Sequence, residues 1–324
     1  MMNIIPLRSL RARVLVVLLA SQLTACDFLG VAARNVPWFF RTPRPAPLAA
    51  RPRADDALLS VLWVGHATTL VQLGDRYVLT DPVFTQLVGG FSRRMVQPGL
   101  RPEALPSRVT VLVSHRHFDH LSKGSFSLIA DHVHTVIAPE GAGADLPRGP
   151  YARRELGWWQ TWEDDGMRIT AVPARHDGGR YLHDRGGHPR AFTGYVIEYR
   201  GTSVYFAGDT AYDEALFREI GRRFPGLTLA LVPIGPITPV AMMRPHHLDP
   251  AQALQATCDV GAAQMVPIHF GTYLHSYDQP GECEARFDEA LLARPELITR
   301  AHRLQIGERW IAIAAWRSSA ASSE

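Results

Sequence analysis

Residues 111–120 read Val111-Leu-Val-Ser-His-Arg-His-Phe-Asp-His120, an apolar run that ends in a dense group of potential metal ligands. Valine and leucine at the first three positions favour a buried β-strand, so the polar group is expected where that strand opens into a loop. Imidazole and carboxylate are the ligand types of catalytic zinc and related metals. The alternative is a polar loop with incidental histidines, but the density of ligand types favours a metal site. The candidate ligands here are His115, His117, Asp119 and His120.

Three later segments place a further candidate ligand just beyond a predicted strand. His176 follows residues 168–172, Asp209 ends the run Val204-Tyr-Phe-Ala-Gly-Asp209, and His269 follows residues 264–268. Alone, each has an ordinary explanation as a hydrogen-bonded histidine or a turn aspartate. A dinuclear catalytic site, however, needs about three or four protein ligands per ion and an open position for water. Their shared position at strand ends therefore favours a ligand role for all three.

The order His-x-His-x-Asp-His, then His, then Gly-Asp-Thr, then His resembles the metallo-β-lactamase superfamily. Within it, the chain more closely resembles N-acyl-phosphatidylethanolamine-hydrolysing phospholipase D and its bacterial relatives. The resemblance extends over about residues 58–273. The stretches that support it are Trp63-Val-Gly-His-Ala-Thr68, Leu79-Thr-Asp-Pro-Val-Phe84, Glu155-Leu-Gly-Trp-Trp159, Tyr205-Phe-Ala-Gly-Asp-Thr210, Pro233-Ile-Gly235, His247-Leu-Asp-Pro250 and Asp259-Val-Gly261.

This resemblance implies an α/β fold, the αββα four-layer sandwich in a single domain, and a centre of two zinc ions. It implies that one zinc is held by His115, His117 and His176, the other by Asp119, His120 and His269, and that Asp209 bridges them. Such metal ions lower the pKa of bound water towards about 7, which makes a nucleophile available at neutral pH. Asp119 is also expected to handle protons. Manganese, iron or nickel could use the same ligands.

Three further residues are candidates for supporting roles. Residues 61–80 read as a hairpin that turns at Gly74, which brings Asp81 near His66. Asp81 is expected to accept the free N–H of a ligand imidazole, which would fix the tautomer of that ring. The alternatives are a turn aspartate before Pro82 and, for His66, a structural histidine. His247 resembles a family histidine near the substrate phosphate, although a plain position before a helix explains it too. The neighbouring His246 complicates that assignment.

The expected activity is that of a metal-dependent hydrolase, a phosphodiesterase of phospholipase D type acting on a phospholipid or similar ester. A lactonase or other carboxylic-ester hydrolase is the alternative enzyme, and a catalytically inactive metal-binding lipoprotein is the alternative from another class. The substrate stays open because Asp177-Gly-Gly-Arg180 stands where the family has tryptophan, and residues 236–243 are smaller than the family's aromatic segment. Such loops form the walls of substrate pockets.

The N-terminus has the pattern of a secretory signal peptide. Arg8, Arg11 and Arg13 precede the short apolar run 14–20, and Leu23-Thr-Ala-Cys26 resembles a bacterial lipobox. Cleavage before Cys26 and lipidation of its thiol would tether the protein to a membrane in the bacterial cell envelope, facing the periplasm. An uncleaved anchor is the alternative.

The expected organisation is a signal peptide at 1–25, a Pro- and Arg-rich extended tether at 26–55, a hydrolase domain at 56–317 and a flexible tail at 318–324. The formal net charge of +3 excludes nucleic acid as an expected partner. Cys258 and Cys283 could pair in an exported protein, but the sequence does not place them together. Strands are expected at residues 58–63, 69–73, 77–80, 110–113, 135–138, 168–172, 194–199, 203–207, 229–233, 264–268 and 310–314, and helices at 123–130, 213–223, 250–260 and 283–293.

Overall fold

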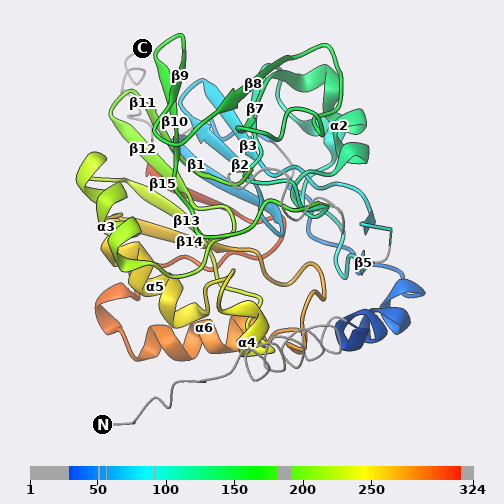
Figure 1. The fold of residues 1–324 in the computed structure, drawn as a ribbon. Coiled ribbons are helices and arrows are strands. Elements are labelled where there is room, and N and C mark those ends of the chain that lie inside the picture. Colours follow the sequence, from blue (N-terminus) through cyan, green and yellow to red (C-terminus); the bar gives the residue numbers. More distant parts are fainter. Residues whose placement is uncertain (1–28, 50–51, 56, 91, 181–190, 315–324) are drawn as a thin grey trace, which may run out of the picture.

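The computed structural model describes residues 29–49, 52–55, 57–90, 92–180 and 191–314. Two mixed sheets form its centre (Figure 1). The seven-stranded sheet has the order β15 (Arg309–Ala314), β1 (Ala57–Gly65), β2 (Thr68–Leu73), β3 (Arg76–Thr80), β6 (Val109–Leu112), β7 (Val133–Pro139) and β8 (Ala152–Leu156). The six-stranded sheet has the order β14 (Gln264–Ile268), β13 (Leu229–Pro233), β12 (Thr202–Phe206), β11 (Gly194–Tyr199), β10 (Met167–Val172) and β9 (Thr161–Asp164). A small separate pair consists of β4 (Leu87–Val88) and β5 (Ser92–Arg93).

Helices cover the outer faces of both sheets (Figure 1). The helix α2 (Lys123–Ile129) lies on the seven-stranded sheet, and α3 (Glu214–Arg223), α5 (Pro250–Asp259) and α6 (Glu282–Leu292) lie on the six-stranded sheet. Shorter elements are α4 (Val240–Met243) and the 3₁₀ turns Pro102–Ala104, Ala130–His132 and Pro295–Leu297. The result is the predicted αββα sandwich in a single α/β domain.

Strand β1 shows why four layers form. Its alternate residues Val61 and Trp63 belong to the core between the sheets, whereas Leu62 and Val64 belong to the core beneath α2. Successive side chains of a strand point to opposite faces, so a strand that is apolar at nearly every position is buried on both. A continuous apolar strand therefore requires a layer on each side.

The strand directions bring the candidate site together at one edge. In the first sheet β1, β3 and β6 run parallel to one another, as do β10, β12 and β14 in the second. Each of these six strands is followed directly by a loop that carries a candidate site residue. The loops meet because the carboxyl ends of parallel strands lie at the same edge of a sheet.

Each predicted strand and helix has an observed counterpart whose bounds differ by at most two residues. The short strands β4 and β5, the edge strands β8 and β9 and the short helix α4 were not predicted. β8 reads Ala-Arg-Arg-Glu-Leu and is mostly exposed, so it lacks the apolar alternation that marks a strand. The expected hairpin at 61–80 is a three-stranded meander, because a second turn at His66-Ala67 separates β1 from β2.

The expected extended tether differs from the structure. Residues 29–39 are helical, and Val31 and Asn35 on one side of this helix are buried. The Asn35 amide donates hydrogen bonds to the Val31 carbonyl at 2.9 Å and to the Leu274 carbonyl at 2.7 Å. Contacts with the rest of the domain order this segment. The amino-acid composition of the segment does not reveal such contacts. The predicted signal peptide, Cys26 and the tail at 318–324 lie outside the described residues.

Two further findings concern the described part of the chain. Cys258 and Cys283 are free thiols there, without a disulfide between them. Among the described residues, no helix is both long enough and apolar enough to cross a membrane.

Candidate metal centre

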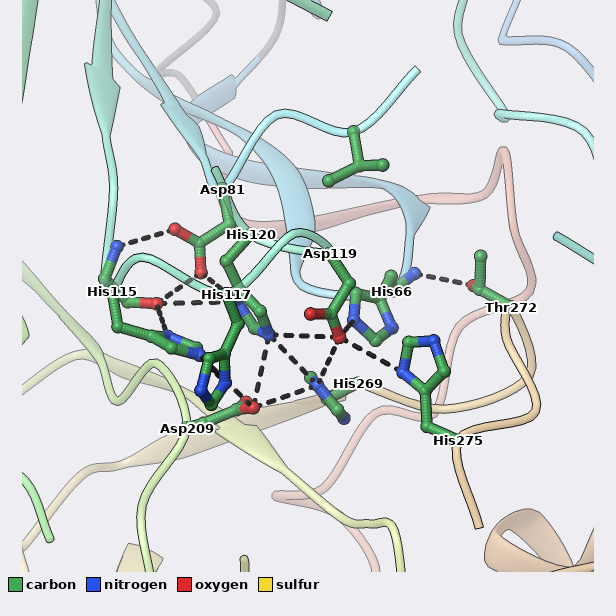
Figure 2. A network of polar contacts seen from close by, with 12 residues as sticks. His66, Asp81, His115, His117, Asp119, His120, Asp209, His269, Thr272 and His275 are labelled. Carbon is green, nitrogen blue, oxygen red and sulfur yellow. Dashed lines mark hydrogen bonds and ion pairs between the residues drawn. The ribbon is translucent and has the colours of Figure 1, made fainter. Parts of the chain in front are cut away.

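Histidine and aspartate side chains from five of the six loops converge at the edge of the sandwich (Figure 2). The sixth loop adds His176, whose Nε2 lies 3.4 Å from His117 Nδ1. His66 follows β1, Asp81 follows β3, and residues 115–120 follow β6. The remaining loops carry His176 after β10, Asp209 after β12 and His269 after β14. Every residue that the sequence nominated as a metal ligand lies in this cluster.

The first group of converging atoms comes from three histidines. His115 Nε2 lies 2.9 Å from His117 Nδ1, and His176 Nε2 lies 3.4 Å from the same atom. Tetrahedral zinc with Zn–N bonds of about 2.0–2.1 Å would hold its ligand nitrogens about 3.3 Å apart. These three nitrogens therefore have the spacing of ligands to one ion.

The second group surrounds Asp209. Its Oδ2 lies 3.2 Å from His120 Nε2 and 3.1 Å from His269 Nε2, and those two nitrogens are 3.2 Å apart. Asp119 Oδ2 is 3.6 Å from His120 Nε2 and 3.9 Å from His269 Nε2. Asp209 Oδ2 is also 4.0 Å from His115 Nε2, so this carboxylate lies between the two groups.

One buried oxygen supports occupation by cations. Asp209 Oδ1 is buried and has no hydrogen-bond partner. A buried carboxylate oxygen without a donor is costly unless a cation or another donor satisfies it. The donor set of histidine and carboxylate thus fits two divalent metal ions with Asp209 between them.

Most of the ligand histidines are held from behind by an acceptor. His120 donates its Nδ1–H to Asp81 Oδ2 at 2.6 Å, and His176 donates its Nδ1–H to the His246 carbonyl at 2.9 Å. His117 Nε2 lies 3.0 Å from Asp177 Oδ1. Such partners fix the imidazole tautomer and leave the other nitrogen free for a metal. Asp177, the departure from the family pattern, therefore contacts a candidate ligand.

Asp81 has further donors of its own. The Ser114 backbone N–H and hydroxyl donate to its two oxygens, each at 2.6 Å. The Ser114 hydroxyl also lies 2.9 Å from His115 Nδ1. Asp81 therefore contacts His120 of the second group directly and His115 of the first group through Ser114.

His66 and His275 both contact Asp119. His66 Nε2 and His275 Nδ1 lie 3.0 and 3.1 Å from Asp119 Oδ2. His66, Asp119, His120 and His269 also offer ligand atoms that lie within 4.8 Å of one another, which makes His66 an alternative ligand. The shorter contacts of Asp209 with His120 and His269 favour Asp209 in that position.

His247 lies at the rim of the cluster, where Asp249 caps the N-terminus of α5 two residues later. Its Nδ1 is 3.7 Å from Asp209 Oδ2 and has no hydrogen-bond partner. The Asp249 capping box with Gln252 and the buried Leu248 hold this turn against the sheet. His247 is thereby placed beside Asp209, while its neighbour His246 contributes its carbonyl to His176.

The backbone at three site residues is left-handed. His66, Asp81 and His269 have φ values of 55°, 32° and 63°. Non-glycine residues rarely adopt this region, and such strain clusters at functional sites. The His66 carbonyl accepts hydrogen bonds from the His269 N–H at 3.0 Å and from the Trp63 indole at 2.9 Å, which hold two of these turns together.

Arg180 stabilises the loop that carries four of the candidate ligands. Its guanidinium donates to the carbonyls of Arg116 at 2.6 Å and Leu121 at 2.9 Å, and lies over the Phe118 ring. Arg116 in turn pairs with Asp145 at 2.7 Å. The Asp177-Gly-Gly-Arg180 segment therefore supports the loop at residues 113–122, which we name the metal loop, through carbonyls on both sides of Asp119 and His120.

Burial sets the protonation of most of the histidines. It lowers the pKa of His115 and His247 well below the usual value, and that of His176 to about 4. Metal ligands must be neutral imidazoles, so these shifts favour coordination. Burial also lowers the pKa of His120, but the carboxylates of Asp209 and Asp119 outweigh it and raise that pKa well above the usual value.

The two carboxylates remain ionised. Burial raises the pKa of Asp119 and Asp209, but the neighbouring histidines outweigh that effect and hold both values well below the usual range. For Asp119 these neighbours are chiefly His120 and His275, and for Asp209 they are His120 and His269. The cluster therefore presents two negative charges to bound cations.

A cleft adjoins the second group of candidate ligands. His66, His269 and His275 line one part of it, and Met95, Phe270 and Leu274 are among its apolar lining residues. A mostly apolar cleft beside convergent polar groups is the usual form of a small-molecule site.

Some of these residues were beyond the reach of sequence analysis. Ser114, His275 and Arg180 stand outside the recognised motif positions, and only contacts made by folding show what they touch. Thr272, whose hydroxyl accepts the His66 N–H at 2.7 Å, carries no sequence signal at all.

Comparison with known proteins agrees with this geometry. A family model described as "Beta-lactamase superfamily domain" matches residues 76–270, and the chain belongs to that superfamily. Fold, family and the His/Asp cluster together define a hydrolase of the metallo-β-lactamase class.

The chain is also similar to particular known proteins. The chain is 31% identical over 275 residues to N-acyl-phosphatidylethanolamine-hydrolyzing phospholipase D 1 of Caenorhabditis elegans, covering 78% of this chain and 75% of that protein. It is 33% identical over 274 residues to an uncharacterized protein of Mycobacterium tuberculosis, covering 80% of this chain and 71% of that one. Among solved structures, an isothiocyanate hydrolase from Delia radicum gut bacteria has a TM-score of 0.61 at 18% identity, covering 79% of this chain and 100% of that one.

Proposed function

We propose that this protein is a zinc-dependent phosphodiesterase of phospholipase D type that acts on a phospholipid or a similar ester at a membrane surface. The observation that carries this proposal is the position of Asp209 Oδ2, 3.1–3.2 Å from the nitrogens of His120 and His269 and 4.0 Å from that of His115. A single carboxylate oxygen between two groups of candidate ligands suits two metal ions held close together.

Two zinc ions would be held by the ligand groups already described. Bound there, they would supply a water of lowered pKa and positive charge that offsets charge developing on phosphoryl oxygens. The residues in the first position are His115, His117 and His176; those in the second are Asp119, His120 and His269; and Asp209 belongs to both.

His247 and Asp119 are the proposed catalytic side chains beside Asp209. Burial lowers the pKa of His247 well below its usual value, so the ring is neutral and one nitrogen carries a proton. That N–H can donate to a substrate oxygen as negative charge develops on it. Asp119 would pass a proton between the cluster and the rings of His66 and His275, and the contacts of its Oδ2 with both rings support this role.

The substrate class rests on family likeness and on the cleft. The relative from Caenorhabditis elegans is named for hydrolysis of an N-acylated phospholipid. The cleft beside His269 has apolar lining residues, including Met95, Phe270 and Leu274, that suit an acyl chain. The smaller loop at residues 236–243 leaves the preferred headgroup and chain length to experiment.

We further propose that the mature protein is a lipoprotein of the bacterial cell envelope, anchored through Cys26 and facing the periplasm. The Leu-Thr-Ala-Cys26 sequence after a short apolar run supports this location. A lipid anchor would keep the cleft close to phospholipid substrate.

The test combines elemental analysis with a substrate screen on the purified full chain. We expect two zinc ions per chain and turnover of bis-p-nitrophenyl phosphate and of phospholipids in mixed micelles. Turnover of lactones without turnover of phosphodiesters would replace the phosphodiesterase with a lactonase. Bound metal without turnover of either class would support the inactive metal-binding lipoprotein. Fewer than one metal ion per chain and no turnover would contradict the proposal.

A further inference from the structure

The helix formed by residues 29–39 has one face packed on the domain and an opposite face that is apolar and exposed. Val31 and Asn35 are buried, whereas Leu29, Val36 and Phe40, in the following turn, are 66%, 57% and 81% exposed. At 3.6 residues per turn, positions 29, 36 and 40 lie on one side of the helix, and positions 31 and 35 lie roughly opposite. The exposed residues therefore form a continuous apolar strip, which we name the outer strip.

The sequence around the outer strip is cationic and aromatic. Residues 28–54 contain five arginines and no aspartate or glutamate. Arg41 and Arg44 are exposed beside the strip, and the Arg41 guanidinium lies 4.5 Å from the centre of the Trp38 ring. An exposed apolar strip in a segment rich in arginine and free of acidic residues is suited to the boundary between headgroups and acyl chains of an anionic bilayer.

The helix that carries the outer strip packs against the segment that lines the cleft beside the metal centre. Asn35 donates to the Leu274 carbonyl, and Gly30 packs so closely on the Tyr277 ring that a side chain at position 30 would collide with it. Leu274 and His275 line the cleft, and His275 Nδ1 is 3.1 Å from Asp119 Oδ2. The strip therefore lies on a segment that leads directly to the candidate site.

A second exposed apolar residue lies across this segment. The Tyr277 N–H donates to the Thr238 carbonyl at 2.9 Å, and α4, which begins two residues after Thr238, exposes Val240. In Figure 1 the blue helix at 29–39 and α4 lie at the lower end of the molecule, whereas α2 lies at the upper right.

The position of Cys26, just before the outer strip, indicates what the strip binds. Cys26 stands three residues before Leu29, a distance of about 10 Å at full extension. An acyl chain attached to Cys26 would therefore enter a bilayer close to the strip. A lipid surface meets the apolar, cationic and positional features together, which a purely protein partner need not do.

We infer that Leu29, Val36 and Phe40 insert into the headgroup–acyl boundary of an anionic phospholipid bilayer and turn the cleft mouth towards it. This inference goes beyond the proposed function, since contact with lipid at the strip does not depend on which ester is hydrolysed. It also differs from simple tethering, because a flexible anchor at Cys26 alone would leave the orientation of the domain unspecified.

Photo-cross-linking tests the inference in the full chain. A photoreactive p-benzoylphenylalanine replaces Phe40 or Val36, and in a matched control it replaces Leu128, which is 50% exposed on α2. Each protein is incorporated into vesicles of phosphatidylglycerol and phosphatidylcholine and irradiated, and its adducts are identified by mass spectrometry. Circular dichroism and metal content verify that the substitutions leave the fold intact.

Lipid adducts at positions 36 and 40, at least tenfold above those at position 128, are the expected result. The yield at position 40 should fall severalfold in vesicles of phosphatidylcholine alone, because the arginines then lose their anionic partners. Adducts to a second copy of the chain, adducts to residues 1–25 of the same chain, or equal lipid labelling at positions 40 and 128 would overturn the inference. Adduct formation needs no turnover, so this outcome is separate from success or failure of the proposed phosphodiesterase activity.

Discussion

Asp81 accepts a hydrogen bond from His120 Nδ1 at 2.6 Å, and both side chains are fully buried. The contact joins the loop after β3 to the loop after β6, two neighbouring parallel strands. Because a carboxylate can only accept here, Nδ1 carries a proton, and Nε2 is the nitrogen that faces Asp209 and His269. This one contact therefore sets the direction of a candidate metal ligand.

Replacing Asp81 by asparagine should weaken metal binding about 10- to 100-fold. The two oxygens of Asp81 accept from His120 and from both donors of Ser114, whereas an amide has one oxygen and turns an N–H₂ towards a donor. Zinc affinity measured by competition with a chromogenic chelator gives the answer. Asp131→Asn, an exposed change on the same domain, serves as the control. Equal zinc affinity in the Asp81→Asn and Asp131→Asn proteins would contradict the supporting role of Asp81.

Asp209→Asn should reduce turnover at least 1000-fold and lower the zinc content below two ions per chain. The change removes the negative charge that lies between the ligand groups while keeping the size of the side chain. Steady-state kinetics and elemental analysis on one preparation measure both effects, and circular dichroism checks the fold. Full activity in a preparation free of wild-type protein would disprove the two-metal mechanism.

Arg180→Ala should lower the free energy of unfolding by about 3–6 kcal/mol, because two buried hydrogen bonds from a charged group are lost at about 1.5–3 kcal/mol each. Both carbonyl acceptors, those of Arg116 and Leu121, lie in the metal loop, so zinc affinity should fall as well. Urea denaturation of the metal-free protein measures the first effect. Arg175→Ala, an exposed change in the same segment, should stay within about 0.5 kcal/mol of wild type. A similar small change in both variants would refute this prediction.

The metal-free protein should lose stability as the pH falls from about 6.5 to about 4. The folded-state pKa of His176 is lowered to about 4, mainly by burial, so in this window the unfolded chain binds a proton that the folded chain does not. His66, His115 and His247 are shifted in the same direction, whereas His120 is shifted in the opposite one and offsets part of the effect. Denaturation midpoints across this range test the sign. Constant or rising stability on acidification would show that it is wrong.

Zinc at a free concentration 100 times its dissociation constant should stabilise the folded protein by about 2.7 kcal/mol per site, since the ion binds the folded ligand cluster. A chelator should reverse the increase in melting temperature completely. His117→Ala, which removes the nitrogen shared by two contacts of the first group, should lose about half of the increase. An unchanged zinc response in His117→Ala would exclude the first group as a binding position.

Much of the fold could be predicted from sequence because its strands are apolar on both faces. β1, β6 and β12 stand out as short apolar runs, and each ends at a candidate ligand. Edge strands such as β8, with charged side chains, escaped prediction because their burial depends on a single neighbour. The helix at residues 29–39 escaped as well, since its order depends on contacts such as that between Asn35 and Leu274.

The sequence by itself determined the positions of the strands, the helices and the candidate ligands, because apolar periodicity and the spacing of histidine and aspartate are local properties of the chain. The architecture and the superfamily followed from the resemblance of these motifs to a known family. The assignment of the candidate ligands to two zinc positions stays a prediction. Only the tertiary structure decided which side chains support these ligands: Asp81 behind His120, Asp177 beside His117, and His275 on Asp119. These partners lie 39, 60 and 156 residues apart in the chain, so no local pattern encodes their contact. They meet because two stacked sheets bring the carboxyl ends of their parallel strands to one edge.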